Sequence, residues 1–134
     1  MISSVHRFHG RSSLRFVYHR GQTVRGQLLS LRYVYNSREQ TYRAAVVVSR
    51  KVSKSAVVRN RARRRIYEAV RKHERRITKP YDLVFTVYDE KVAIIEPTEL
   101  QNMIVGQLEK AGVFDDTVPT EANRGILDEK ETNI

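Results

Sequence analysis

The chain contains no cysteine among its 134 residues. Disulfides, thiolate nucleophiles and cysteine-based metal sites are therefore excluded, and a reducing compartment fits this composition. Long apolar runs are also absent, because the longest one, Ala44–Val48, is far too short to span a bilayer. The first ten residues lack the apolar core of a secretory signal. We therefore expect a soluble, cytoplasmic protein.

Acidic residues are scarce relative to basic ones, and the net charge is +10. Residues 1–112 carry 23 Lys and Arg against 9 Asp and Glu, whereas residues 113–134 carry 2 against 6. The basic excess indicates a nucleic acid or another anionic partner. We predict one domain over 1–112 and a disordered acidic tail over 113–134. The simplest interpretation of the tail is a solvated end, and the alternative is weak competition with RNA for the basic surface.

The first part of the chain changes from a helical to an alternating pattern. Ser12–Arg20 is predicted as a short helix, capped by Ser12 or Ser13 and stopped by a left-handed Gly21. Residues 24–35 then alternate with period two and form one strand or two. A turn at residues 36–37 predicts a hairpin to the next strand, at 42–49, whose consecutive valines are typical of a central strand covered on both faces.

The second part of the chain predicts a long helix, a strand and a last helix. The long helix runs over about 56–76, with Ser53 or Ser55 as its N-cap and an apolar stripe at helical spacing. Alternation over 81–88 predicts a strand, and Pro97 and Gly112 bound the final helix. The result is an α+β fold, a single-domain αβββαβα-type sandwich with about four strands.

The long helix is the most informative element, because its first half contains Arg59-Asn60-Arg61-Ala62-Arg63-Arg64-Arg65. Six of these seven side chains are cationic or amide, and they surround the circumference that the apolar stripe leaves open. Like charges at this spacing repel one another, so the pattern favours an anionic partner. Arginine suits bidentate phosphate contact and base stacking. The alternative is a solvated basic face that only keeps the protein soluble.

These residues also resemble a known family. Ser49-Arg50-Lys51-Val52, then Ala56-Val57-Val58-Arg59-Asn60-Arg61, then Arg63-Arg64, Glu68-Ala69 and Arg71 resemble the signature of the bacterial ribonuclease P protein component. The order of elements is similar along about residues 10–112. The resemblance implies a left-handed strand–helix–strand crossover, against the general right-handed rule.

The resemblance implies a function as well. Such proteins are subunits of a ribozyme that removes the 5′ leader of precursor tRNA, an endoribonuclease whose catalytic RNA carries the chemistry with Mg²⁺. The protein, as one copy in the holoenzyme, docks on that RNA and holds the leader in a cleft on its sheet. The RNA-contacting positions implied are Arg50, Lys51, Lys54, Arg59, Asn60, Arg61, Arg63, Arg64 and Arg71. The leader-contacting positions implied are Leu14, Tyr18, Arg32 and Tyr33.

Four positions depart from the family pattern. Leu14 stands where the family commonly has Phe, and Arg32 where it has an aromatic residue, so Phe16, Tyr33 and Tyr35 are candidates to stack on the leader instead. Tyr67 and Arg65 stand where the family commonly has Arg and an apolar residue, respectively. This pair is consistent with an exchange of roles between neighbouring positions.

No catalytic or metal-ligating residue is predicted in the chain itself. A protein that hydrolysed phosphodiesters would normally show clustered carboxylates for two metals, or paired histidines acting as acid and base. We expect this protein to supply electrostatics and positioning, while Mg²⁺ is bound mainly by the RNA partner. The alternatives are a ribosomal or ribosome-assembly RNA-binding protein, a self-sufficient nuclease and a DNA-binding protein.

Overall fold

The computed structural model describes residues 2–8 and 10–115 of the chain. In chain order the elements are η1 (Ser4–His6), α1 (Arg11–Arg20), β1 (Gln22–Val24), β2 (Leu29–Tyr35), β3 (Arg43–Val47), α2 (Ala56–Lys72), η2 (Glu74–Arg76), β4 (Tyr81–Val87), η3 (Glu90–Ala93) and α3 (Pro97–Ala111), where η marks a short 3₁₀ turn. The predicted α+β fold is confirmed, with the 24–35 segment divided into two strands.

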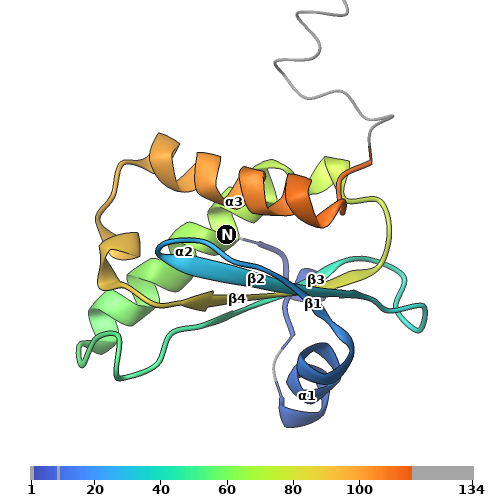
Figure 1. Ribbon diagram of the computed structural model, residues 1–134, viewed down its shortest axis with the longest axis horizontal. Helices are drawn as coiled ribbons and strands as arrows, with labels where there is room; N and C mark the ends of the chain where they lie inside the picture. Colours follow the sequence, from blue (N-terminus) through green and yellow to red (C-terminus); the bar gives the residue numbers. More distant parts are fainter. Residues whose placement is uncertain (1, 9, 116–134) are drawn as a thin grey trace, which may run out of the picture.

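One mixed sheet with strand order β1-β2-β4-β3 organises this part of the chain. β2 pairs antiparallel with both β1 and β4, whereas β3 and β4 are parallel. The helix α2 therefore connects two neighbouring parallel strands. Helices α2 and α3 cover one face of the sheet and α1 covers the other (Figure 1). The left-handed sense of the β3–α2–β4 crossover stays a prediction.

The predicted hairpin between the strands at 24–35 and 42–49 is wrong, because β4 lies between β2 and β3. The buried carboxylate of Asp82, at the start of β4, joins its two neighbours. Asn36 Nδ2 donates to Asp82 Oδ2 at 2.9 Å, and Arg43 Nε and Nη2 donate to the two carboxylate oxygens at 3.0 Å each. A carboxylate that is 0% exposed needs such partners. This polar cluster therefore favours β4 in the middle position.

The strand β3 lies at an edge of the sheet, so the prediction of a central strand is wrong. Both of its faces are nevertheless covered, as predicted. Ala44 and Val46 belong to the main core on the side of α2 and α3, whereas Ala45 packs with Phe8 and Val17 on the side of α1. The free edge is partly paired, because the Phe8 N–H donates to the Ala44 carbonyl at 3.2 Å. Covered faces and a protected edge explain the apolar run.

The ends of α1 differ from the prediction. Gly10 is the N-cap residue and no side chain caps the helix, so neither Ser12 nor Ser13 has that role. Gly21 follows the helix with a φ of −82°, which is extended rather than left-handed. A Cβ at Gly21 would lie 2.4 Å from the Val17 carbonyl oxygen. Close backbone approach, not backbone handedness, is therefore the reason for glycine at this position.

The helix α2 begins as predicted and ends earlier. Ser55 is the N-cap, and its Oγ accepts the Val58 N–H at 3.3 Å. Regular α-helix ends at Lys72, and the chain continues as η2 instead of reaching residue 76 in the same helix. The buried face contains the predicted apolar stripe together with Tyr67, and its members are Ala62, Ile66, Tyr67, Ala69 and Val70.

The folded domain extends beyond the predicted boundary at residue 112. Gly112 ends α3 in the left-handed conformation, with a φ of 73°. Val113 and Phe114 then return to the core and are 3% and 8% exposed. The Asp115 N–H donates to the Arg76 carbonyl, and the Arg76 guanidinium lies 3.9 Å from the centre of the Phe114 ring. Residues 113–115 are thus part of the domain, and the rest of the predicted tail lies outside the described residues.

The helices of the described segments are too short and too polar to cross a lipid bilayer. The expected cytoplasmic location stays a prediction.

Candidate nucleic-acid interface

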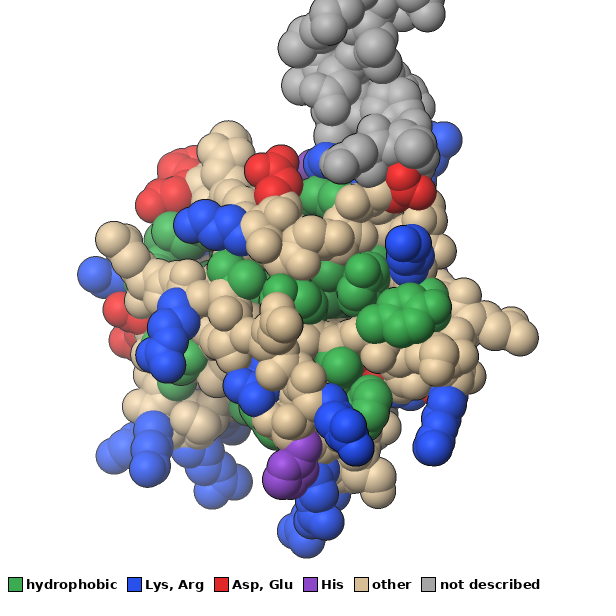
Figure 2. All heavy atoms as spheres, turned by 45° about the vertical axis from the view of Figure 1, so that its right-hand side comes forward, with side chains coloured by type: hydrophobic (Ala, Val, Ile, Leu, Met, Phe, Trp, Pro, Cys, Tyr) green, Lys and Arg blue, Asp and Glu red, His purple; other side chains and the backbone are tan. Residues whose placement is uncertain are grey.

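The nine predicted RNA-contacting residues form one region of the molecule, which we call the basic surface. It consists of the connection between β3 and α2 and the solvent side of α2, and contains Arg50, Lys51, Lys54, Arg59, Asn60, Arg61, Arg63, Arg64 and Arg71. Seven of these side chains are exposed, and only Arg59 and Arg63 are half-buried. On the face that Figure 2 shows, Lys and Arg side chains project mainly from the lower half, while Asp and Glu side chains lie mainly in the upper half.

The two half-buried arginines attach α2 to the chain that precedes it. Arg59 Nη1 donates to the Ser53 carbonyl at 2.9 Å. Arg63 Nη1 donates to Asn60 Oδ1 at 2.9 Å, and its Nη2 approaches the Val48 carbonyl at 3.4 Å. These contacts hold the β3–α2 connection against the start of the helix. The cations of the loop and of the helix are therefore presented as one pre-arranged surface.

Arg61 and Arg64 differ from this pair. Both are exposed, and no hydrogen bond joins either guanidinium to another group in the described part of the chain. Their donors are therefore available to phosphate oxygens, which an arginine can bind in bidentate geometry.

The structure accounts for the exchange predicted at Arg65 and Tyr67. Arg65 turns toward η3, where Nη1 donates to the Val92 carbonyl at 2.7 Å and Nη2 donates to the Ile95 carbonyl. Tyr67 is 8% exposed and packs in the core, and burial raises the pKa of its hydroxyl. Neither residue belongs to the basic surface.

Arg71 lies on the same helix but already has an anionic partner. Its Nε donates to both carboxylate oxygens of Glu68 at 3.1 Å, and Nη2 donates to one of them. Hydrogen bonding to Arg71 lowers the pKa of Glu68 to about 2. A phosphate at this position would have to compete with Glu68, so Arg71 contributes less to anion binding than Arg61 or Arg64.

Three of the predicted leader-contacting residues, Leu14, Tyr18 and Arg32, lie together on the α1 side of the sheet. Leu14 is half-buried against the small core beneath α1, and Tyr18 is 43% exposed. Arg32 Nε donates to the Val17 carbonyl at 3.1 Å, Nη1 donates to Thr23 Oγ1 at 2.8 Å, and Nη2 donates to the Tyr18 carbonyl. The Arg32 guanidinium thus holds the end of α1 on the sheet.

Tyr33, the fourth predicted residue, lies on the other face. It packs against the main core on the side of α2 and α3, and its hydroxyl donates to Gln22 Oε1 at 2.8 Å. Successive residues of a strand point to opposite faces, so Tyr33 cannot share a surface with Arg32. Tyr35 lies two residues after Tyr33 in the same strand, so it faces the same side of the sheet as Tyr33. Phe16, on α1, is 37% exposed.

The sequence pattern did not predict that Ser30 and Tyr88 form a hydrogen-bonded pair on the α1 side of the sheet. The Ser30 and Tyr88 hydroxyls lie 2.7 Å apart, and Tyr88 is 56% exposed. The period-two pattern of 81–88 places Tyr88 on the face of the sheet opposite Tyr81. This alternation was the only feature of the sequence that indicated the position of Tyr88. The exposed ring and hydroxyl of Tyr88, held by the buried Ser30, extend the surface that Tyr18 and Arg32 begin.

No group of three His, Asp or Glu side chains suited to a metal ion occurs in the portion of the chain that the structure describes.

Comparison with known proteins identifies the family. Residues 2–112 match the family model described as Ribonuclease P. The ribonuclease P protein component of Clostridium kluyveri is 37% identical over 112 residues, which cover 82% of this chain and 97% of that protein. The corresponding protein of Chloroflexus aurantiacus is 47% identical over 75 residues, 56% of this chain. That match spans 55% of the relative, about half of its length.

Solved structures show the same fold at low identity. The RNase P protein of Staphylococcus aureus superposes with a TM-score of 0.72 at 23% identity, over 82% of this chain and 98% of that one. The RNase P protein of Thermotoga maritima gives 0.69 at 19% identity, over 78% and 96%. Because the family model covers most of the sequence and the Clostridium relative is matched over nearly its whole length, the chain belongs to the ribonuclease P protein family.

Proposed function

We propose that this protein is the protein subunit of a ribonuclease P ribonucleoprotein in the cytoplasm, present as one copy per complex. In this proposal the basic surface binds the catalytic RNA, and the α1 side of the sheet binds the single-stranded 5′ leader of precursor tRNA. The observation that carries it is the exposed series of cations along one side of α2, fixed to the preceding loop through Arg59 and Arg63. Family membership supports the same role.

In this proposal the protein positions the catalytic RNA and the precursor tRNA relative to each other. Guanidinium groups neutralise phosphates and lower the repulsion between the two RNAs, which favours their association. The exposed rings of Tyr18 and Tyr88 and the Tyr88 hydroxyl suit a single strand, whose bases stack on aromatic rings and whose 2′-hydroxyls accept and donate hydrogen bonds. In this proposal Mg²⁺ is bound mainly by the RNA partner.

Reconstitution tests the proposal. Purified protein is mixed with a ribonuclease P catalytic RNA and precursor tRNA, and cleavage at the 5′ end is followed at low Mg²⁺. We expect the protein to stimulate cleavage in the presence of the RNA, and to give none without it. If the protein fails to stimulate cleavage at every Mg²⁺ concentration tested, the proposal is contradicted and a ribosomal role is favoured. Cleavage by RNA-free protein would instead identify a nuclease.

A matched competition identifies the nucleic acid bound on the α1 side. Precursor tRNA with a leader is compared with mature tRNA and with duplex DNA. We expect the leader to add affinity that the variant Tyr18→Ala loses, whereas Tyr35→Ala, on the opposite face, keeps it.

A further inference from the structure

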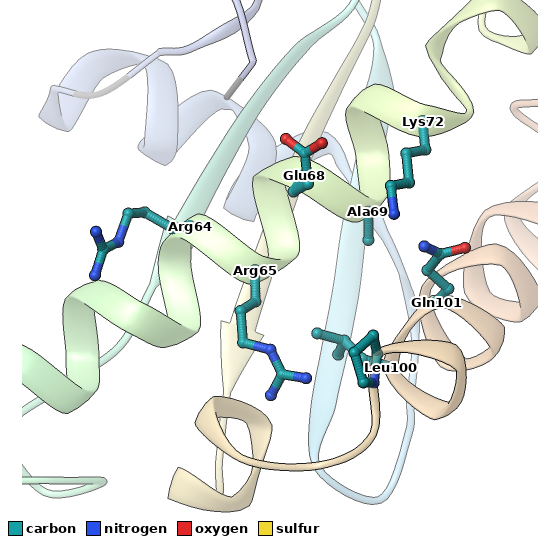
Figure 3. A pocket seen from close by; sticks show the side chains of 8 residues that line it. Arg64, Arg65, Glu68, Ala69, Lys72, Leu100 and Gln101 are labelled. Carbon is teal, nitrogen blue, oxygen red and sulfur yellow. The ribbon is translucent and has the colours of Figure 1, made fainter.

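A pocket of about 380 Å³ lies between α2 and α3, on the face of the sheet opposite α1. Figure 3 shows it between the second half of α2 and the start of α3. Its floor is apolar and consists of Ala69, Pro97 and Leu100. Ala69 and Leu100 are 3% and 2% exposed and belong to the core, whereas Pro97 is exposed at the start of α3. A pocket of this size and lining suits a flat, largely apolar group.

One wall of the pocket is rigid. Arg65 contributes to the lining, and its guanidinium is fixed by the carbonyls of Val92 and Ile95. In Figure 3 the Arg65 side chain leaves α2 toward the 3₁₀ turn and Leu100. A planar guanidinium held in this way can stack on a flat ring without losing further conformational freedom.

The rim of the pocket is cationic on the α2 side and amide on the α3 side. Lys72 lies at the far end of this part of α2 from Arg64, whose side chain extends away from Leu100 and Gln101, and Gln101 faces Lys72 from α3 (Figure 3). The Glu68 carboxylate lies near this rim, but it points away from Leu100 and Gln101 and binds Arg71. The first turn of α3 carries Glu99, which disfavours an anion on that side. An anionic group would therefore lie on the α2 side, beside Lys72.

An apolar floor, a stacking wall, an amide edge and a cation beside that edge together match the parts of a nucleotide. We propose that this pocket binds one unstacked nucleotide of single-stranded RNA. The base lies on Ala69, Pro97 and Leu100, its edge is hydrogen-bonded by the Gln101 amide, and its phosphate contacts Lys72. Proteins that hold an extruded base use this combination of apolar packing and edge hydrogen bonds. The pocket joins the basic surface through Arg64, so the inference rests on the proposed function in taking RNA as the partner.

Titration with nucleoside monophosphates tests the pocket without the partner RNA. ¹H–¹⁵N spectra of the full-length protein are recorded with added UMP or AMP, and with ribose 5-phosphate as the control that lacks a base. We expect saturable shifts at residues 69–72 and 98–101, including the Gln101 side-chain amide, at millimolar nucleotide. Ribose 5-phosphate should shift these signals much less. Equal shifts with ribose 5-phosphate, or no saturable shifts at these residues, would overturn the proposal.

Two pairs of variants locate the binding. Gln101→Phe closes the mouth of the pocket, whereas Asn102→Phe places the same ring at the exposed neighbouring position. Lys72→Ala removes a rim cation, whereas Lys79→Ala removes an exposed lysine outside the pocket. We expect nucleotide affinity to fall about tenfold in Gln101→Phe, the loss expected for one base contact, and to stay unchanged in both controls. Unchanged affinity in Gln101→Phe, with a native melting curve, would overturn the proposal.

Reconstitution separates failure of this inference from failure of the proposed function. If the wild-type protein stimulates the catalytic RNA but Gln101→Phe and Asn102→Phe stimulate it equally, and nucleotides do not bind, only the pocket assignment is wrong. If the wild-type protein gives no stimulation, the proposed function fails first. Nucleotide binding would then still report on the pocket itself.

Discussion

At the scale of single residues, the arginines of α2 divide into those that bind the protein and those that are open to a partner. Arg59 and Arg63 bind backbone carbonyls, and Arg65 does so at η3. Arg61 is exposed. The sequence could not show this division, because all of these positions carry the same side chain. Which carbonyl lies within reach depends on how the neighbouring segments are packed.

Substitution of Arg59 and Arg61 by alanine should therefore have different effects. Arg61→Ala should weaken RNA binding and reduce the slope of log K against log salt by about one, with an unchanged melting temperature. Arg59→Ala should weaken binding and also lower the free energy of unfolding by about 1 kcal/mol, because the hydrogen bond to Ser53 is lost. Binding isotherms at several salt concentrations and thermal melts measure both quantities. Equal melting temperatures for the two variants would show that the Ser53 contact does not stabilise the fold.

The ion pair of Glu68 and Arg71 gives a second prediction at this scale. Arg71 lowers the pKa of Glu68 from 4.5 to about 2, so its stabilising effect is present above pH 4.5 and is lost as the pH falls toward 2. In Arg71→Ala the pKa of Glu68 should return toward its ordinary value. Carboxyl chemical shifts followed over pH 2–6 measure it. Lys72→Ala is the matched control, and a Glu68 pKa that moves equally in both variants would contradict the assignment to Arg71.

At the scale of elements, α1 is held by a contact that its own sequence does not contain. The helix has no side-chain N-cap, and its last carbonyls are bound by Arg32 of β2. Short helices with little intrinsic stability depend on such tertiary contacts. The structure shows Arg32 bound to the end of α1 beside Tyr18. Contact of Arg32 with the leader, which the family pattern implies, stays a prediction.

Loss of the Arg32 guanidinium should therefore loosen α1 specifically. In Arg32→Ala, hydrogen exchange should accelerate over residues 14–20 while the amides of β4 stay protected. Arg32→Lys should not restore protection, because an ammonium group cannot reach three acceptors in the plane of a guanidinium. Arg20→Ala, an exposed residue of α1, is the control. Acceleration spread evenly over the whole domain would show that Arg32 acts on global stability instead.

At the scale of the whole molecule, the core is closed by residues beyond the last helix. Phe114 and Val113 pack on the core, and Thr78 Oγ1 donates to Asp115 Oδ2 at 2.9 Å. These contacts connect the end of the domain to the segment between α2 and β4. The sequence predicted the boundary at 112, because a left-handed Gly112 and an acidic composition follow the helix. Two apolar residues give too short a pattern to identify as core.

Truncation tests this boundary. A chain that ends at residue 112 should unfold at a lower temperature than one that ends at residue 115, because about 2 kcal/mol or more of apolar burial is lost with the two side chains. The chain ending at 115 should melt like the full-length protein, which follows from the sequence-based expectation for the acidic tail. Thermal melts of the three chains measure the difference. Equal melting of the two shortened chains would show that Phe114 does not stabilise the domain.

The sequence by itself determined the order of elements, the apolar stripe of α2 and the position of the cations. These are local properties, because a helix or strand repeats its pattern within a few residues. The tertiary structure decided that β4 separates β2 from β3, that Arg32 binds the end of α1, and that Arg65 binds η3. Each of these depends on segments far apart in the chain meeting around a buried group such as Asp82. The free energy of such contacts exists only once the whole domain has folded.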